Sequence, residues 1–143
     1  MRRRKNAHRA KPCPCGSGRI YRECCGVYHG GEPAPDAVAL MRSRYSAYAL
    51  GLSDYIIGTT LPGGDSWHED ESGWKRGLRA FAREFFFAGV EILESQLGET
   101  RATVTFRAVL RKGAADRSFT ERSEFVLVDG RWVYARGDTQ DPG

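Results

Sequence analysis

The chain has 143 residues, of which 41% are hydrophobic and 28% are charged, and its formal net charge is +4. That length fits one domain with a small appendage, and the composition is typical of a soluble globular protein. The longest uniformly apolar stretch, 85–90, is far shorter than the about 20 residues that a membrane-spanning helix needs. The basic N-terminus also lacks the apolar segment and cleavage site of a signal peptide. These features exclude a membrane span and predict a cytoplasmic protein.

The excess positive charge is confined to the N-terminus. Residues 1–22 contain eight Lys or Arg and no acid, whereas the remainder contains 14 basic and 18 acidic residues. Residues 1–11 show no hydrophobic periodicity and are predicted to be a disordered basic tail. Such a tail is suited to contacts with nucleic acid, an anionic membrane or an acidic protein partner, and a solvated tail without a partner is the alternative.

All four cysteines of the chain follow this tail closely, as Cys13-Pro-Cys15 and then, after eight residues, Cys24-Cys25. Thiols gathered on one short segment are typical of a tetrahedral metal site, and zinc prefers four Cys or His ligands in closed structural sites. We therefore predict one structural zinc ion held by Cys13, Cys15, Cys24 and Cys25, with His29 as the alternative to Cys25. A closed shell leaves no position for water, so this site is predicted to be structural and not catalytic.

A Gly- and Pro-rich segment, 30–35, separates the predicted zinc knuckle at 12–30 from a predicted domain at 36–140. Asp36 as N-cap and Gly51 as C-terminal stop delimit the first helix of that domain. Its apolar residues recur at intervals of three and four, which predicts one apolar stripe. The stripe consists of Val38, Met41, Tyr45, Tyr48 and Leu52.

Two shorter helices are predicted next. Ser53 is a plausible cap for a helix that runs through 55–57 and ends at Gly58. Another helix is indicated where Trp74, Leu78 and Phe81 follow one another at helical spacing.

The hydrophobic period changes from helical spacing to two after residue 85, which predicts strands. Turns are expected at 98–100 and 113–116, and Asp129-Gly130 is a strong signal for a type I′ hairpin turn. The predicted strands lie near 90–93 and over 102–110, 119–127 and 131–136. Helices followed by an antiparallel meander predict an α+β fold.

Aromatic residues spread over these helices and strands are candidates to line an internal pocket, with Arg42, Arg44 and Glu121 as polar candidates. The aromatic candidates are Tyr45, Tyr48, Tyr55, Trp74, Phe86, Phe106 and Trp132. The alternative is that the aromatic residues simply fill the core. The predicted ligand-binding set is Arg42, Tyr45, Tyr48, Tyr55, Glu121 and Trp132. No catalytic residue is predicted, because the segment His68-Glu69-Asp70-Glu71 is interpreted as a solvated acidic loop.

The segment from Cys13 to Gly26 resembles a SEC-C motif, the zinc knuckle that ends the bacterial preprotein-translocase motor ATPase and helps it contact an export chaperone. The last ligand of that motif is commonly His, and Cys25 occupies its position here. The resemblance implies zinc binding and a partner related to export or translation, without a named activity.

The segments 40–48, 54–55 and 129–134 resemble the YchJ-like family of small bacterial proteins. That resemblance implies a nuclear-transport-factor-2-like (NTF2-like) body, in which a curved antiparallel sheet wraps helices to form a cone. We predict a cytoplasmic zinc-binding adaptor that docks protein or ribonucleoprotein partners through the basic knuckle. The alternative is a small-molecule-binding or enzymatic cone with a purely structural knuckle.

Overall fold

The computed structural model describes residues 11–140, in which five helical segments precede a run of five strands. The predicted basic tail at 1–11 lies almost wholly outside the described residues, of which only Lys11 is part. The helical segments are η1 (Tyr21–Glu23), α2 (Cys25–His29), α3 (Ala37–Leu50), α4 (Ser53–Gly58) and α5 (Glu71–Glu84). The strands are β1 (Phe86–Leu97), β2 (Arg101–Lys112), β3 (Ala115–Asp116), β4 (Phe119–Val128) and β5 (Arg131–Gln140).

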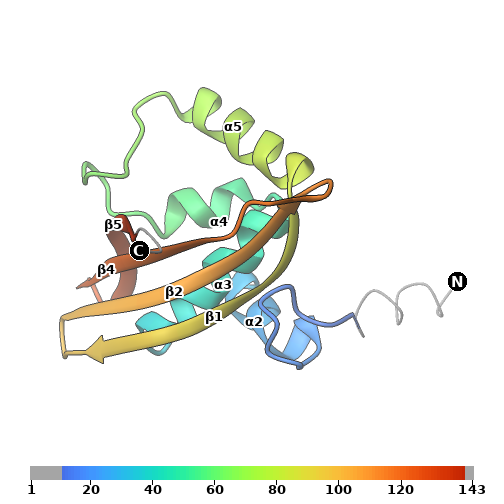
Figure 1. The fold of residues 1–143 in the computed structure, drawn as a ribbon. Helices are drawn as coiled ribbons and strands as arrows, with labels where there is room; N and C mark the ends of the chain where they lie inside the picture. The colour runs from blue at the N-terminus through green and yellow to red at the C-terminus, as the bar shows by residue number, and fades with distance from the viewer. Residues whose placement is uncertain (1–10, 141–143) are drawn as a thin grey trace, which may run out of the picture.

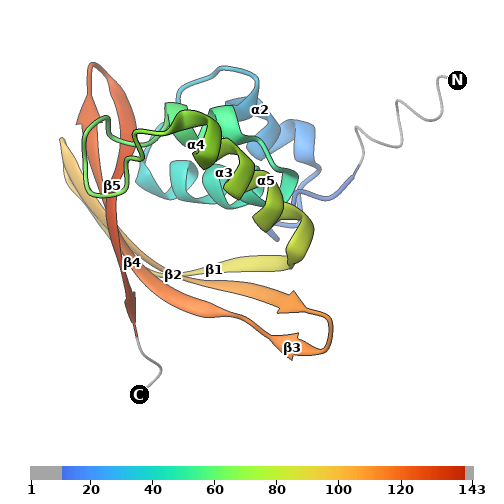
Figure 2. The same cartoon turned by 90° about the horizontal axis from the view of Figure 1, so that it is seen from above.

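The strands form one antiparallel sheet in the order β1-β2-β4-β5, and short β3 pairs with the end of β2. The sheet is curved, and α3, α4 and α5 lie within its concave side (Figures 1 and 2). The sheet does not close, and the loop after α4 extends its far edge: Leu61 donates its backbone N–H to the Tyr134 carbonyl, and Tyr134 donates to Thr59. The predicted α+β fold with an antiparallel meander is confirmed.

Helix α3 begins and ends as its sequence predicts. The Asp36 carboxylate accepts the backbone N–H of Ala39 at 2.9 Å, and Gly51 adopts a left-handed conformation with φ 70°. Its burial differs from the predicted single stripe, because the knuckle, α4 and the sheet each cover a side of this helix. Polar Ser43, Arg44 and Ser46 are consequently buried together with the apolar residues.

The other predicted elements are present, but several of their ends differ. Strand β1 covers Phe86–Leu97 and is much longer than the predicted 90–93, and β5 runs to Gln140, beyond the predicted end at 136. Leu52, not Ser53, is the N-cap residue of α4 and provides no side-chain cap, while Ser53 is buried inside the first turn. Ala115 and Asp116, expected in a turn, pair with Lys112 and Arg111 as β3. The hairpin between β4 and β5 has positive φ at both Asp129 and Gly130, as a type I′ turn requires.

The core lies between α3 and the concave side of the sheet. The alternation predicted over 102–110 places every second side chain of β2 in that core. The knuckle belongs to the same buried cluster, because Cys13, Cys15 and Cys25 pack with α3 residues. None of the helices within 11–140 is long and apolar enough to cross a membrane.

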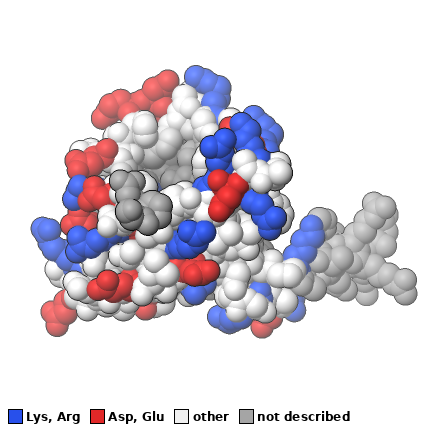
Figure 3. All heavy atoms as spheres, in the orientation of Figure 1, with Lys and Arg blue, Asp and Glu red and all other residues white. Residues whose placement is uncertain are grey.

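Charged side chains are unevenly distributed on the face seen in Figure 3. Arg76, Arg79 and Arg83 are exposed along α5, and acidic Glu69 and Asp70 lie in the loop that leads into it. A hollow separates these basic and acidic areas (Figure 3).

Candidate functional site

Four cysteine side chains converge where the knuckle meets the body. The sulfur atoms of Cys13, Cys15, Cys24 and Cys25 all lie within 4.8 Å of one another, and those of Cys15 and Cys24 are 3.7 Å apart. A tetrahedral zinc ion with Zn–S bonds of about 2.3 Å has sulfur–sulfur edges of about 3.8 Å. All four are free thiols, so the cluster fits one tetrahedral metal ion in a closed shell.

The backbone of the knuckle turns tightly enough to bring these thiols together because Gly16 and Gly18 adopt φ values of 80° and 86°. The Cys13 N–H donates to the Arg19 carbonyl at 2.9 Å and closes the loop. The Ser17 hydroxyl lies 3.2 Å from the Cys24 sulfur. The second cysteine pair stands at the start of α2, so a loop and a short helix supply two ligands each.

The thiols influence one another electrostatically. Hydrogen bonds from the Cys13 and Cys25 thiols lower the pKa of Cys15. Hydrogen bonds to the Cys13 and Cys15 sulfurs raise the pKa of Cys25, and burial raises the pKa of Cys24. A bound cation would supply the positive charge that full ionisation of the cluster needs. The guanidinium of Arg42, 3.8 Å from the Cys15 sulfur, contributes part of it.

His29, the alternative fourth ligand, is engaged elsewhere. A carbonyl oxygen only accepts hydrogen bonds, so Nε2 of His29 donates to the Ser43 carbonyl at 2.7 Å. Nδ1 then accepts from the Tyr21 hydroxyl at 2.6 Å, and burial lowers the pKa of the imidazole. Nε2 thus connects the knuckle to α3, Nδ1 is held within the knuckle, and Cys25 is the residue that completes the sulfur cluster.

The knuckle docks on a break in the sheet. The pairing of β1 with β2 shifts between Phe87 and Gly89, and the freed Gly89 N–H donates to the Tyr45 hydroxyl at 2.8 Å. The next N–H, that of Val90, donates to the Cys15 carbonyl at 3.3 Å. The cysteine loop and Tyr45 therefore take up hydrogen bonds that a regular ladder would otherwise make.

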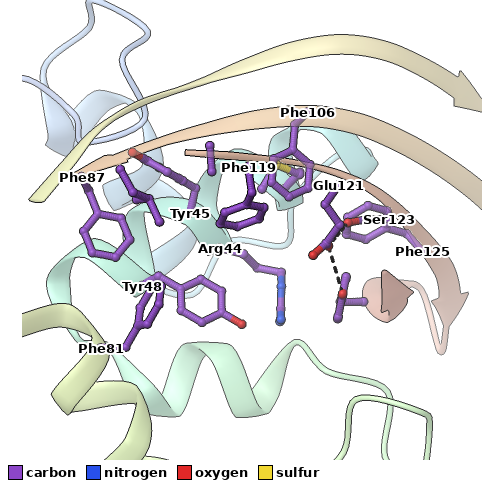
Figure 4. Close-up of a pocket in the computed structure, with 14 residues that line it drawn as sticks. Arg44, Tyr45, Tyr48, Phe81, Phe87, Phe106, Phe119, Glu121, Ser123 and Phe125 are labelled. Atoms are coloured by element: carbon purple, nitrogen blue, oxygen red, sulfur yellow. Dashed lines mark hydrogen bonds between the residues drawn. The ribbon is translucent and has the colours of Figure 1, made fainter. Parts of the chain in front are cut away.

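A second candidate site is a cavity of about 270 Å³ between α3, α5 and the concave side of the sheet (Figure 4). Aromatic side chains from several elements form most of its wall. Apart from the tyrosine hydroxyls, its polar side chains are those of Arg44, Glu121 and Ser123. The aromatic wall consists of Tyr45, Tyr48, Phe81, Phe87, Phe106, Phe119, Phe125 and Tyr134.

Arg44 stands at one side of this cavity with only 4% of its surface exposed. Its Nη1 donates to the Ile56 carbonyl at 3.1 Å and to the hydroxyls of Thr59 and Thr60 at 2.7 and 3.2 Å. The guanidinium carbon lies 4.5 Å from the centre of the Tyr134 ring. Cation–π contact and three oxygen acceptors thus offset the cost of burying this charge.

Glu121 on β4 presents its carboxylate to the same cavity (Figure 4). Its Oε2 accepts from the Ser123 hydroxyl at 2.6 Å and from the Tyr134 hydroxyl at 3.1 Å. Burial and the Glu121 charge raise the pKa of Tyr134, so its phenol stays protonated and donates. The hydrogen bond between Glu121 and Tyr134 requires glycine at position 137, because a Cβ there would collide with the oxygen atoms of both side chains.

The structure brings together half of the predicted ligand-binding set. Tyr45, Tyr48 and Glu121 line the cavity, whereas Arg42, Tyr55 and Trp132 do not. Arg42 lies two residues from Arg44 on α3, and at 100° per residue its side chain points away toward Cys15.

Tyr55 and Trp132, the other two predicted residues that lie outside the cavity, make contacts elsewhere. The Tyr55 hydroxyl hydrogen-bonds Ser43 at 2.7 Å and its ring packs on His29, while Trp132 borders a separate groove. Of the further aromatic candidates, Trp74 packs on Trp67 and Phe86 is 63% exposed. The prediction did not select Ser123, although it shares the alternating face of Glu121 on β4.

Comparison with known proteins agrees with both parts of the fold. Residues 36–137 match the family model for the YchJ middle NTF2-like domain, and residues 9–26 match the SEC-C motif. A SEC-C motif containing protein from Rhodopseudomonas palustris is 39% identical, with 90% of this chain and 98% of that one covered and a TM-score of 0.75.

Two other solved structures extend the comparison. A SEC-C motif containing protein from Psychrobacter arcticus is 25% identical, with 96% of this chain and 87% of that one covered and a TM-score of 0.75. An NTF-2 like protein of unknown function from Shewanella oneidensis is 19% identical, with 73% and 95% covered and a TM-score of 0.51. The last similarity concerns the fold alone.

Proposed function

This chain belongs to the family defined by the YchJ middle NTF2-like domain, and from that premise we propose that it binds a small organic molecule inside its curved sheet. The observation that carries the proposal is a cavity of about 270 Å³ whose wall combines aromatic rings with the side chains of Arg44 and Glu121. Small-molecule sites share this composition of apolar walls and a few placed polar groups. Of the two functions predicted from the sequence, the geometry favours the ligand-binding alternative.

Zinc is the metal that we propose for the cysteine cluster, because four thiolates in a closed tetrahedron are its usual structural site. Cys13, Cys15, Cys24 and Cys25 would hold the ion, and its role would be to keep the knuckle folded against β1 and α3. Thiolate ligation needs reduced cysteines, which supports a cytoplasmic location.

Ligand binding is tested by filling the cavity. Ala108 on β2 is buried in its wall, so Ala108→Leu places a larger side chain in that space while keeping it apolar. We expect compounds from a fragment collection to raise the melting temperature of the native protein and to lose that effect in the variant. Ala80→Leu, on the exposed side of α5, is the matched control.

A collection that shifts neither the native protein nor the control contradicts the proposal. Shifts that persist unchanged in a folded Ala108→Leu protein contradict it equally, because the compounds would then bind elsewhere.

Docking of an acidic protein or ribonucleoprotein through the knuckle is a second candidate function. The observation that favours it is a group of exposed cations, Lys11, Arg19 and Arg22, around the cysteine cluster, none of which forms an ion pair with another described residue. We expect polyglutamate to bind the metal-loaded protein with salt-sensitive affinity, and reversal of these three charges to abolish binding. Unchanged binding in the triple variant removes this candidate.

A further inference from the structure

Arg44 has hydrogen-bonding capacity that the protein leaves unused on its cavity side. All its hydrogen bonds to described residues come from Nη1. No buried side-chain nitrogen or oxygen within 11–140 lacks a partner, so Nε and Nη2 contact open space. Because the side chain is otherwise enclosed, that space is the cavity that Arg44 lines.

The charge of Arg44 is also not neutralised by any residue within 11–140. Among the described residues, no carboxylate forms an ion pair with it. The Tyr134 ring and neutral oxygens surround the guanidinium instead. A buried cation gains most from an anionic partner, and a guanidinium with two free nitrogens matches the two oxygens of a carboxylate.

Glu121 presents the complementary feature. Its Oε2 is occupied by two hydroxyl donors, whereas its Oε1 accepts no hydrogen bond from a described residue. A carboxylate oxygen only accepts, so the group that completes this end must be a hydrogen-bond donor. Figure 4 shows the Arg44 guanidinium and the Glu121 carboxylate bordering the same space from α3 and β4.

The rest of the cavity wall is mostly apolar, and the cavity is of limited size. Phe106, Phe119 and Phe125 cover it from the sheet, and Tyr48 and Phe81 cover it from the helices. A cavity of about 150 Å³ is large enough for benzene, so about 270 Å³ has room for one aromatic ring with short substituents at both ends.

We infer that the ligand is an aromatic or similarly flat apolar molecule with a carboxylate that binds Arg44 and a hydroxyl that donates to Glu121. This inference rests on the proposed ligand-binding function and adds to it the chemical class and the orientation of the ligand. Arg44 and Glu121 form no ion pair with each other, although both contact Tyr134, so a molecule with both functions satisfies them at once.

The probes are three hydroxyaryl acids with increasing spacer length: 4-hydroxybenzoate, 4-hydroxyphenylacetate and 3-(4-hydroxyphenyl)propionate. Isothermal titration of the metal-loaded full chain is expected to show binding of at least one of them. For that acid, we expect about tenfold weaker binding of the analogue without the hydroxyl and of the neutral amide, because each lacks one charge-assisted hydrogen bond.

Glu121→Gln tests the donor end without changing the size of the side chain. We expect the variant to bind the hydroxyaryl acid about tenfold more weakly and to retain the affinity of the acid that lacks the hydroxyl. Glu124→Gln is the matched control, because Glu124 lies on the opposite face of β4 and pairs with Arg136. The amide comparison tests the Arg44 end in the native protein, so it does not depend on an Arg44 variant that fails to fold.

The outcomes separate the inference from the function on which it rests. Equal binding of acid, amide and unsubstituted analogue, or equal loss in Glu121→Gln and Glu124→Gln, overturns the inference. The inference is also overturned if none of the three acids binds but neutral fragments bind and lose that binding in Ala108→Leu. In that case the proposed function still stands. If neither fragments nor acids bind, both fall.

Discussion

The cysteine cluster and the aromatic cavity differ in how the chain builds them. All four thiols of the cluster come from one stretch of sequence, 13–25, whereas the cavity is lined from α3, α5 and four strands. A site built from one short segment can be recognised from the spacing of its ligands in the sequence, because short-range backbone geometry determines how they converge. A site assembled from distant segments depends on helix rotation and strand register, which spacing alone does not specify. The two sites meet at Tyr45, which lines the cavity and bonds the strand on which the knuckle docks.

Metal removal is the largest perturbation that tests this contrast. If zinc holds the knuckle, a strong chelator is expected to lower the free energy of unfolding by about 4 kcal/mol, the linkage value for metal at one thousand times its Kd. Chemical denaturation with and without chelator measures the difference. In Cys15→Ser the chelator is expected to have little further effect, and an equal loss in that variant would show that the cluster is not the metal site.

Gly137→Ala is expected to perturb the cavity without touching the cluster. The added Cβ would collide with the Glu121 carboxylate and the Tyr134 hydroxyl, and overpacking of this kind costs about 1–3 kcal/mol. Gly77→Ala on α5 is the control, because nothing lies near the added Cβ and Ala favours a helix over Gly by about 1 kcal/mol. Denaturation midpoints that fall for Gly77→Ala as much as for Gly137→Ala would contradict this explanation of the cavity.

Tyr45→Phe is expected to affect both regions with a smaller loss, about 1–2 kcal/mol. The hydroxyl accepts the Gly89 N–H at 2.8 Å and donates to the Val109 carbonyl at 3.3 Å, so its removal leaves a buried donor without a partner. Burial raises the pKa of Tyr45 to about 12, so the phenol is protonated at neutral pH.

Hydrogen exchange of the Gly89 and Val90 amides locates the effect of this substitution. We expect faster exchange at both positions in Tyr45→Phe, whereas Tyr48→Phe, whose hydroxyl makes no hydrogen bond with a described residue, serves as the control. Equal exchange rates of these two amides in the two variants would show that the Tyr45 hydroxyl does not link the cavity to the strand on which the cysteine cluster docks.

The smallest expected effect is a pH dependence from His29. Burial lowers its folded pKa below the unfolded value of about 6.5, so the unfolded state binds the proton more readily. Stability from the neutral imidazole is therefore fully present above about pH 6.5 and is lost as the pH falls toward the lowered folded pKa. Free energies of unfolding at several pH values should depend less steeply on pH in His29→Gln than in the native protein. An identical slope in the variant would show that other groups account for the dependence.

Much of the fold was predictable because its signals are local. Asp36 and Gly51 terminate α3 by capping chemistry, the alternation from Ala102 to Leu110 places one face of β2 in the core, and Asp129-Gly130 forms the expected turn. The cysteine spacing likewise indicated a converging cluster, and the structure brings those four sulfurs together.

The cavity was only partly predictable. To choose between Arg42 and Arg44, one must know which face of α3 points into the cavity. The sequence does not show this, because polar Ser43 and Ser46 are buried and the buried side of the helix is therefore not uniformly apolar. The shift in pairing between Glu124 and Phe125 brings both Tyr134 and Gly137 next to Glu121, which regular alternation along β5 does not indicate. Such irregularities arise from tertiary packing and leave no local pattern.

The docking of Cys15 on Val90 has a consequence for the order of events during synthesis. The cysteine segment leaves the ribosome long before β1, so its thiols can meet metal while the surface that buries them does not yet exist. A nascent chain would thus carry an accessible cysteine cluster until β1 and β2 emerge and pair. Metal loading at that stage would protect the thiols from oxidation during the interval and deliver a preformed knuckle to the growing sheet.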